Sequence, residues 1–174
     1  MFALHRANVA DHGDLFHRWQ NTPYVAEAWN EAGSREEHDA WLRNRRQDPH
    51  IEPLIGTLDG TPFAYLEVYW AREDRIGPYC EPGAFDQGLH LLVGEPTFLG
   101  GPLTSAWMRA TFHFLFLREP RTRRLVGEPD AGHERVLRRL RETGWRKRKE
   151  FDFPHKRAAL VTLDRDRFFG GQRP

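Results

Sequence analysis

A histidine in an apolar run is the first residue of this sequence with a side chain suited to proton transfer. His90 lies in Gly88-Leu-His-Leu-Leu-Val-Gly94, whose length and apolar character predict a buried strand. Side chains alternate along a strand, so His90, Leu92 and Gly94 share one face. A histidine with an ordinary pKa of about 6.5 exchanges protons at neutral pH, but a lone strand histidine is more often structural. Both roles stay open at this point.

A glycine turn follows this strand and leads into a predicted core helix. Gly100-Gly101-Pro102 breaks the chain, and residues 103–117 are apolar enough for a long helix with Pro102 in its first turn. A helix N-terminus offers unpaired N–H groups and a positive dipole end to an anion such as phosphate. The turn matches neither GxxxxGK(S/T) nor GxGxxG. By itself it therefore indicates a tight connection rather than a phosphate site.

A carboxylate, Asp130, ends the next predicted strand. Residues 123–128 predict that short strand, and residues 131–143 predict a helix that Gly144 caps. An aspartate just before a helix is a natural N-cap. This structural role is compatible with a second role in chemistry.

The other segments predict the elements that hold these residues. Residues 11–20 predict a short helix that Pro23 interrupts, and Ser34 with Glu37 is a capping box that opens a second helix, ended by Asp48-Pro49. Residues 52–57 and 63–70 flank Asp59-Gly60 and predict a β-hairpin, and residues 158–164 predict a final strand. Hairpins first and strand–helix alternation later are typical of a mixed α/β or α+β sheet domain.

Length and composition restrict the class of protein. The chain has 174 residues, which predicts a single domain over residues 1–174 with a substantial core. Lys and Arg number 26 against 25 Asp and Glu, and the mean hydropathy is −0.72, so charge-driven disorder and a membrane-spanning architecture are excluded. Cys80 is the only cysteine, and the N-terminus lacks a signal-type apolar run, so we expect a cytoplasmic protein.

Basic residues concentrate in residues 118–149, where Arg and Lys outnumber Asp and Glu. Such a segment can receive a phosphorylated ligand, or it can be a solvated face. A nucleic-acid partner is disfavoured, because the basic residues lack interleaved aromatics and the chain is nearly neutral.

Taken together, several segments resemble the GNAT superfamily of acyl-CoA-dependent acyltransferases, and within it the branch that acylates hydroxylamines during hydroxamate siderophore biosynthesis. The resemblance spans nearly the whole chain. It is carried by His17-Arg-Trp-Gln-Asn-Thr-Pro23 with Trp29, Asp59-Gly-Thr-Pro-Phe-Ala-Tyr-Leu-Glu-Val-Tyr-Trp-Ala-Arg-Glu-Asp74, Asp86-Gln-Gly-Leu-His-Leu-Leu-Val-Gly-Glu95, Phe114-Leu-Phe-Leu with Pro120-Arg-Thr122, Val126-Gly-Glu-Pro-Asp130 and Pro154-His-Lys-Arg-Ala-Ala-Leu160. It implies the GNAT fold, a central mixed and mostly antiparallel sheet flanked by helices.

The resemblance also implies a co-substrate, acetyl-CoA or succinyl-CoA, with no metal. In that family the strand matching residues 89–93 holds the pantetheine arm, and the loop and helix N-terminus after it hold the pyrophosphate. The residues carried over are Leu92, Val93, Gly94, Phe98, Gly100, Gly101, Leu103, Thr104 and His133. The adjacent glycines depart from the usual Arg/Gln-x-x-Gly-x-Gly/Ala loop. Leu140 stands where many members carry a tyrosine that acts as general acid for the departing thiolate.

For catalysis, the resemblance implies His90 as base and Asp130 as its acidic partner. An alkylamine with a pKa of about 10.4 arrives protonated, whereas a hydroxylamine is much less basic and arrives neutral, so histidine is a suitable base. The branch-specific residues expected at the acceptor, a small N-hydroxylated diamine or N6-hydroxylysine, are Trp19, Trp29, Glu67, Tyr69, Trp70, Asp86 and Lys156. Glu67 or Asp86 would pair with a distal ammonium, and about half of these aromatics are expected in the core.

Three alternatives remain from the sequence. The chain would be an acyltransferase of hydroxylated amines, an acyltransferase of ordinary amines of the aminoglycoside type, or a noncatalytic acyl-CoA-binding module. No membrane partner is expected, and the sequence is compatible with a monomer or a homodimer.

Overall fold

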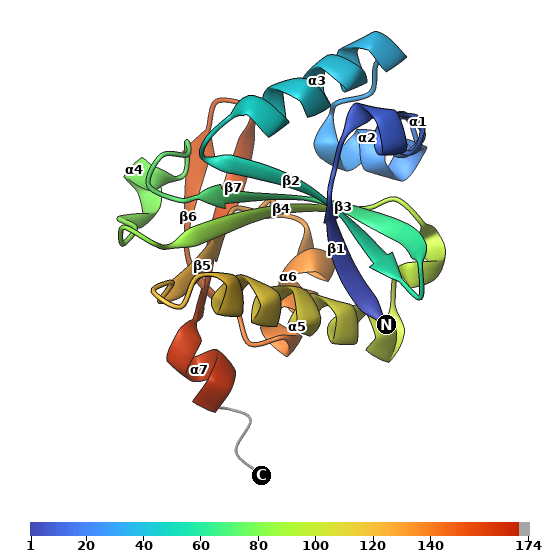
Figure 1. Cartoon of the computed structure of the whole chain (residues 1–174). Coiled ribbons are helices and arrows are strands. Elements are labelled where there is room, and N and C mark those ends of the chain that lie inside the picture. Colours follow the sequence, from blue (N-terminus) through green and yellow to red (C-terminus); the bar gives the residue numbers. More distant parts are fainter. Residues whose placement is uncertain (171–174) are drawn as a thin grey trace. The chain divides into compact units, whose positions relative to one another are not determined.

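A computed structural model of the chain describes residues 1–170 and contains a seven-stranded sheet with the strand order β1-β2-β3-β4-β5-β7-β6 (Figure 1). The strands are β1 (Phe2–Arg6), β2 (Ile51–Leu58), β3 (Thr61–Trp70), β4 (Gln87–Val93), β5 (Arg124–Gly127), β6 (Arg146–Phe153) and β7 (Lys156–Asp164). The helices are α1 (Val9–Gln20), α2 (Pro23–Trp29), α3 (Arg35–Gln47), α4 (Gly77–Cys80), α5 (Gly101–Arg118), α6 (Glu134–Glu142) and α7 (Arg165–Gly170). The pairs β1–β2, β5–β7 and β6–β7 are antiparallel and β4–β5 is parallel, which confirms the expected mixed sheet.

The chain divides into two compact units. Unit 1 comprises residues 1–68 and 90–100, and unit 2 comprises residues 69–89 and the chain from residue 101 onward. The single domain expected from the length stays a prediction.

In unit 1, α1 packs against α2 and α3, and α3 packs against β2 (Figure 1). Phe16, Trp19, Leu42, Tyr65 and Leu92 are core residues of this unit. The predicted hairpin is confirmed as β2 and β3. Its turn has positive φ angles at Asp59 (49°) and Gly60 (79°), as tight two-residue hairpin turns require.

The helices of unit 1 begin at residues with clear local causes. The capping box before α3 is confirmed, since Ser34 and Glu37 bond to each other's backbone N–H. α1 begins at Val9, two residues before the predicted start, because the Asn8 side chain caps the Asp11 N–H. The prediction that Pro23 only interrupts a helix was incomplete. Pro23 is the first residue of α2, where its missing N–H costs nothing.

In unit 2, α5 is the predicted core helix, and its buried side chains include Trp107, Phe112 and Phe116. The predicted helix at residues 131–143 begins later, at Glu134, with His133 in the N-cap position. Asp130 is therefore not the N-cap, and that prediction was wrong. A turn closed by the bond from the His133 N–H to the Asp130 carbonyl, 3.1 Å, separates them.

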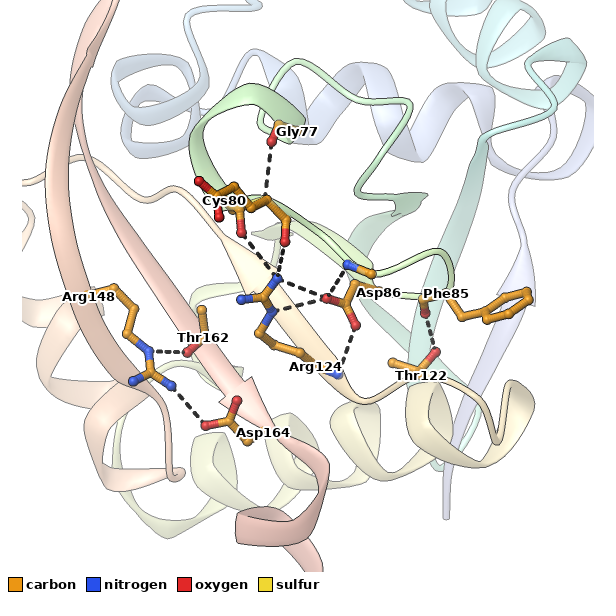
Figure 2. Close-up of polar contacts among 11 residues, drawn as sticks. Gly77, Cys80, Phe85, Asp86, Thr122, Arg124, Arg148, Thr162 and Asp164 are labelled. Carbon is orange, nitrogen blue, oxygen red and sulfur yellow. Dashed lines mark hydrogen bonds and ion pairs between the residues drawn. The ribbon is translucent and has the colours of Figure 1, made fainter.

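Strand β6 was not predicted from the sequence. It pairs with β7 and presents mostly exposed basic and acidic side chains, so it lacks the apolar alternation that marks a half-buried strand. Charged side chains are typical of edge strands. Arg148 of β6 reaches across to Thr162 (2.7 Å) and Asp164 (2.9 Å) of β7 (Figure 2).

Within residues 1–170, no helix is long and apolar enough to cross a membrane. The same residues contain no group of three or more His, Cys, Asp and Glu side chains that could hold a metal ion.

Candidate active site

A buried carboxylate, Glu67, is the centre of the most connected polar cluster in unit 1. Its Oε1 atom accepts hydrogen bonds from Trp41 Nε1 (2.9 Å), Arg45 Nε (3.2 Å) and Tyr65 OH (2.8 Å). Trp41 and Arg45 lie four residues apart on α3 and so share one helix face, whereas Tyr65 and Glu67 lie two apart on β3 and share one strand face. Helix and strand periodicity together bring these four side chains to one point.

The second oxygen of Glu67 faces the histidine of β4. His90 Nδ1 lies 3.2 Å from Glu67 Oε2. An ionised carboxylate only accepts hydrogen bonds, so Nδ1 carries the hydrogen of this contact and the neutral ring is the Nδ1–H tautomer. His90 is also edge-on to Trp29, with ring centroids 6.5 Å apart and an interplanar angle of 81°. The half-buried imidazole thus has a carboxylate at Nδ1 and an indole edge-on to its ring.

The charge state of Glu67 follows from competing effects. Burial raises the pKa of this carboxyl, but the His90 hydrogen bond and charge, the Arg45 charge and the Tyr65 hydroxyl lower it more, so its pKa lies below the ordinary value of 4.5. Glu67 is therefore ionised at neutral pH. Burial, together with the adjacent Glu67 charge, raises the pKa of Tyr65 well above its ordinary value, so Tyr65 remains a hydrogen-bond donor.

The tryptophans expected at the acceptor have different surroundings in unit 1. Trp19 is fully buried, and its Nε1 donates to Glu95 Oε1 (2.9 Å), which also accepts from Arg18 (2.6 Å). A Cβ atom at Gly94 would lie 2.1 Å from Trp19, so the indole fills the space that this glycine leaves. Trp29 is half-buried beside Tyr65 and His90. The structure thus places Trp29 next to the histidine, whereas both faces of the Trp19 indole are buried in the core.

The end of β4, expected to hold the pantetheine arm, already has some of its backbone groups paired. The Gly94 N–H donates to the Phe63 carbonyl (2.8 Å), and the Val93 carbonyl accepts from Tyr24 OH (2.7 Å). Leu92 is buried in the core of unit 1, and Phe98 stacks on Phe63 with ring centroids 4.6 Å apart. Gly94 therefore contributes its small size here rather than an available N–H.

The glycine turn leads directly into α5. Gly100 and Gly101 both have positive φ angles, 90° and 61°, which side chains other than glycine adopt rarely. Leu103 is exposed and Thr104 is buried in the first turn of α5. Pro102 has no N–H, so the donors of this turn come from its neighbours.

A cation lies at this helix start that the sequence did not single out. Arg139 of α6 donates from Nη1 to Ser105 Oγ (3.0 Å) and to the Gly101 carbonyl (3.4 Å) within unit 2. The long basic segment gave no way to choose it, because only the α5–α6 packing distinguishes Arg139 from its neighbours. The same Nη1 also pairs with Glu142 Oε2 of α6 (2.8 Å), so a carboxylate partly offsets this cation at the positive end of the helix dipole.

Asp86, the other carboxylate expected to bind an ammonium, is enclosed within unit 2 (Figure 2). Its Oδ2 accepts from Arg124 Nε (3.0 Å) and the Gly83 N–H (3.0 Å), and its Oδ1 accepts from the Arg124 N–H (3.1 Å). Arg124 Nη2 also donates to the carbonyls of Cys80 (3.1 Å) and Glu81 (3.0 Å). This arrangement joins the loop after β3 to β5.

The remaining expected residues lie in unit 2. Tyr69 is buried, and its hydroxyl donates to Glu128 Oε2 (2.9 Å), while Trp70 is half-buried at the end of β3. Lys156 donates to the Glu128 carbonyl (2.6 Å), and burial lowers the pKa of this lysine. Asp130 and His133 are both exposed, and Asp130 Oδ1 accepts from the Gly132 N–H (2.8 Å).

Sequence reasoning missed Trp41, Arg45 and Tyr65 as members of the Glu67 cluster. The signal that could have found them is their spacing, which is i and i+4 on a capped helix and i and i+2 on a strand. Their convergence on one oxygen needed the packing of α3 on the sheet.

The class of the domain is given by the family model that the chain matches. The description "Acetyltransferase (GNAT) domain" matches residues 8–153, and the chain belongs to this family. The resemblance to the hydroxylamine-acylating branch is also confirmed by the curated relatives.

One relative is the N(6)-hydroxylysine O-acetyltransferase of Escherichia coli, which is 43% identical over 169 residues, covering 97% of this chain and 54% of the relative. Another is a hydroxyornithine transacylase of Ajellomyces capsulatus, 44% identical over 158 residues, covering 91% of this chain and 36% of the relative. This chain therefore spans about half, or less, of the length of these relatives.

Two solved structures share the fold. An uncharacterized protein of Bacillus halodurans superposes with a TM-score of 0.91 at 27% identity, covering 97% of this chain and 86% of that one. The aminoglycoside acetyltransferase AAC(6')-Ib, solved in complex with coenzyme A, superposes with a TM-score of 0.87 at 19% identity, covering 99% and 100% of the two chains.

Proposed function

We propose that this chain transfers an acyl group from acyl-CoA to the nitrogen of a small N-hydroxylated amine, forming a hydroxamate for siderophore biosynthesis. The observation that carries the proposal is the half-buried His90, held by an ionised carboxylate beside the Trp29 indole. The names of the relatives support the acceptor class, because they act on N6-hydroxylysine and hydroxyornithine. N6-hydroxylysine and N-hydroxylated diamines are the proposed acceptors.

In the proposed reaction the hydroxylamine nitrogen attacks the thioester carbonyl carbon. A C–N bond forms, the carbonyl π electrons move to oxygen, and His90 Nε2 takes the proton that the nitrogen loses. The oxyanion then restores the carbonyl, and the C–S bond breaks with its electron pair on sulfur. The products are the hydroxamate and CoA, whose thiolate recovers the proton from the imidazolium.

Acyl-CoA is the proposed co-substrate, either acetyl-CoA or succinyl-CoA. The turn at Gly100 and Gly101 and the first turn of α5 would hold its phosphates, with the Arg139 guanidinium beside them, since anions bind at helix N-termini beside cations. The other residues proposed to contact it are Leu92, Val93, Gly94, Phe98, Leu103, Thr104 and His133. Asp130, Tyr69, Trp70 and Lys156 stay proposed contributors to catalysis or acceptor binding.

The first experiment measures thiol release from acetyl-CoA and from succinyl-CoA. Each is combined with N-hydroxycadaverine, N6-hydroxylysine or the unhydroxylated counterpart. Release confined to the hydroxylated amines is the expected result and names both substrates. Equal use of plain amines would make the chain a general amine acyltransferase, and CoA binding without any release would make it a binding module.

The His90→Ala variant tests the proposed base. We expect turnover to fall by about 10²-fold or more while the protein stays folded. A folded variant with near-wild-type turnover would remove His90 from the mechanism.

A further inference from the structure

We propose that Glu67 is a positioning residue for His90, which holds the imidazole in the Nδ1–H tautomer and so leaves proton uptake to Nε2. This inference rests on the proposed function only for its kinetic part. The sequence offered Glu67 or Asp86 as the partner of the acceptor's distal ammonium, and the contacts of Glu67 favour the new role.

The burial and contacts of Glu67 leave little for a diffusing ammonium to bind. The side chain is 2% exposed, and both oxygens already have partners. Three donors on Oε1, from α3 and β3, prevent the carboxylate from rotating, so Oε2 is held toward His90. A carboxylate fixed in this way can orient a ring that must keep one nitrogen protonated.

Two further side chains that carry charge or a titratable group contact Glu67 besides His90. Arg45 of α3 approaches Glu67 Oε1 and stacks on Trp41, with its guanidinium carbon 4.2 Å from the ring centroid. Tyr65 of β3 is the other titratable side chain bonded to Glu67. Arg45 thus gives Glu67 a permanently charged partner on Oε1, while Oε2 is the oxygen that faces the histidine.

A second carboxylate in unit 1 provides a matched control. Glu95 also accepts from an indole N–H, that of Trp19, and from an arginine, Arg18, but no described contact joins it to a histidine. Glu95→Gln therefore changes the same kind of carboxylate and keeps the His90 surroundings. Glu67 is also the more buried of the two (2% exposed against 26%), so a change of the His90 tautomer, rather than a loss of stability, identifies the histidine contact.

The direct test is the tautomer of His90, read from the ¹⁵N chemical shifts of labelled histidine at a pH where the ring is neutral. The wild-type protein should show Nδ1–H. In Glu67→Gln the amide oxygen still accepts from Trp41, Arg45 and Tyr65, so the amide N–H₂ faces Nδ1 and the ring should change to Nε2–H. A wild-type Nε2–H tautomer, or no change in the variant, would overturn the proposal.

The kinetic test separates kcat from KM. Glu67→Gln should lower kcat by about a hundredfold at every pH, because the wrong tautomer cannot take the proton at Nε2, with KM for acyl-CoA changed less than about threefold. Glu95→Gln should keep kcat within about threefold and keep the wild-type tautomer. Equal losses of kcat in the two variants would indicate a merely structural role for Glu67.

The two proposals fail in different ways. If none of the amines causes thiol release but the tautomers are as expected, the proposed function is rejected and the positioning role of Glu67 is retained. Thiol release with hydroxylamines but an unchanged tautomer in Glu67→Gln would reject the positioning role alone. If Glu67→Gln does not fold, the tautomer of the wild-type protein still tests the proposal, because an Nε2–H ring would overturn it.

Discussion

Glu67 and Asp86 are both buried carboxylates with an arginine partner, yet their surroundings give them different capacities. Asp86 bonds to Arg124 and to backbone N–H groups, none of which changes protonation near neutral pH (Figure 2). Glu67 shares its two oxygens between fixed donors and a histidine. A buried carboxylate saturated by permanent donors stabilises a loop, whereas one that contacts a titratable ring can also take part in proton transfer.

The comparison is tested most strongly by turnover in Glu67→Gln and Asp86→Asn. We expect a loss of kcat of about a hundredfold in the first variant and less than about threefold in the second, because only Glu67 fixes an imidazole. Unfolding in denaturant should show a loss of about 2 kcal/mol for Asp86→Asn. A large loss of turnover in a stable Asp86→Asn protein would contradict the distinction.

Replacing the arginine partner of each carboxylate should destabilise the protein more at Asp86 than at Glu67, the opposite of the ranking expected for turnover. Arg124→Met leaves the buried Asp86 carboxylate with backbone donors only and takes the Nη2 donor from two carbonyls, so we expect a loss of about 3 kcal/mol in the free energy of unfolding. Arg45→Met leaves Glu67 with Trp41, Tyr65 and His90, so we expect about 1 kcal/mol. Unfolding in denaturant measures both losses, and a loss in Arg45→Met equal to or larger than that in Arg124→Met would contradict the distinction.

Acid should remove the contribution of Glu67 to stability. Its folded pKa lies below the ordinary value of 4.5, so the contribution is complete above the unfolded pKa and is lost as pH falls through the folded pKa. The difference in unfolding free energy between the wild type and Glu67→Gln should therefore narrow as the pH falls below about 4.5. A difference that stays constant down to acid unfolding would mean that the Glu67 pKa is not lowered on folding.

The smallest effect is expected for Tyr65→Phe. It removes one of three donors from Glu67 Oε1 but leaves the histidine contact, so we expect about 1 kcal/mol of destabilisation and less than a threefold change in kcat. Thermal unfolding and steady-state kinetics measure both. A loss of turnover comparable to that of Glu67→Gln would show that the Tyr65 hydroxyl, and not the carboxylate alone, determines the orientation of the His90 imidazole.

Local signals in the sequence were sufficient for several elements near the candidate site. The Asp59-Gly60 turn predicted the hairpin that carries Glu67, the capping box predicted the helix that carries Trp41, and the apolar run predicted the strand that carries His90. Each of these signals lies within a few residues of the element it specifies.

Long-range contacts explain what the sequence could not give. Glu67 was singled out only as one of two candidates for the acceptor's ammonium, because its partners Trp41 and His90 come from other elements. Arg139 could not be distinguished from the other basic residues of its segment, because its contact with Ser105 at the α5 start depends on where α6 packs. Strand β6 depends on pairing with β7 rather than on its own apolar pattern.

The discontinuity of unit 1 has a consequence for synthesis on the ribosome. Residues 69–89, which belong to unit 2, separate Glu67 from His90 in the chain. The helices α1 to α3 and the β2–β3 hairpin leave the ribosome before β4, and so without Leu92 to complete their core. A nascent chain halted at residue 89 would therefore contain Glu67 in an incomplete unit 1. The contact between Glu67 and His90 can form only after residues 90–100, the second segment of unit 1, have been translated.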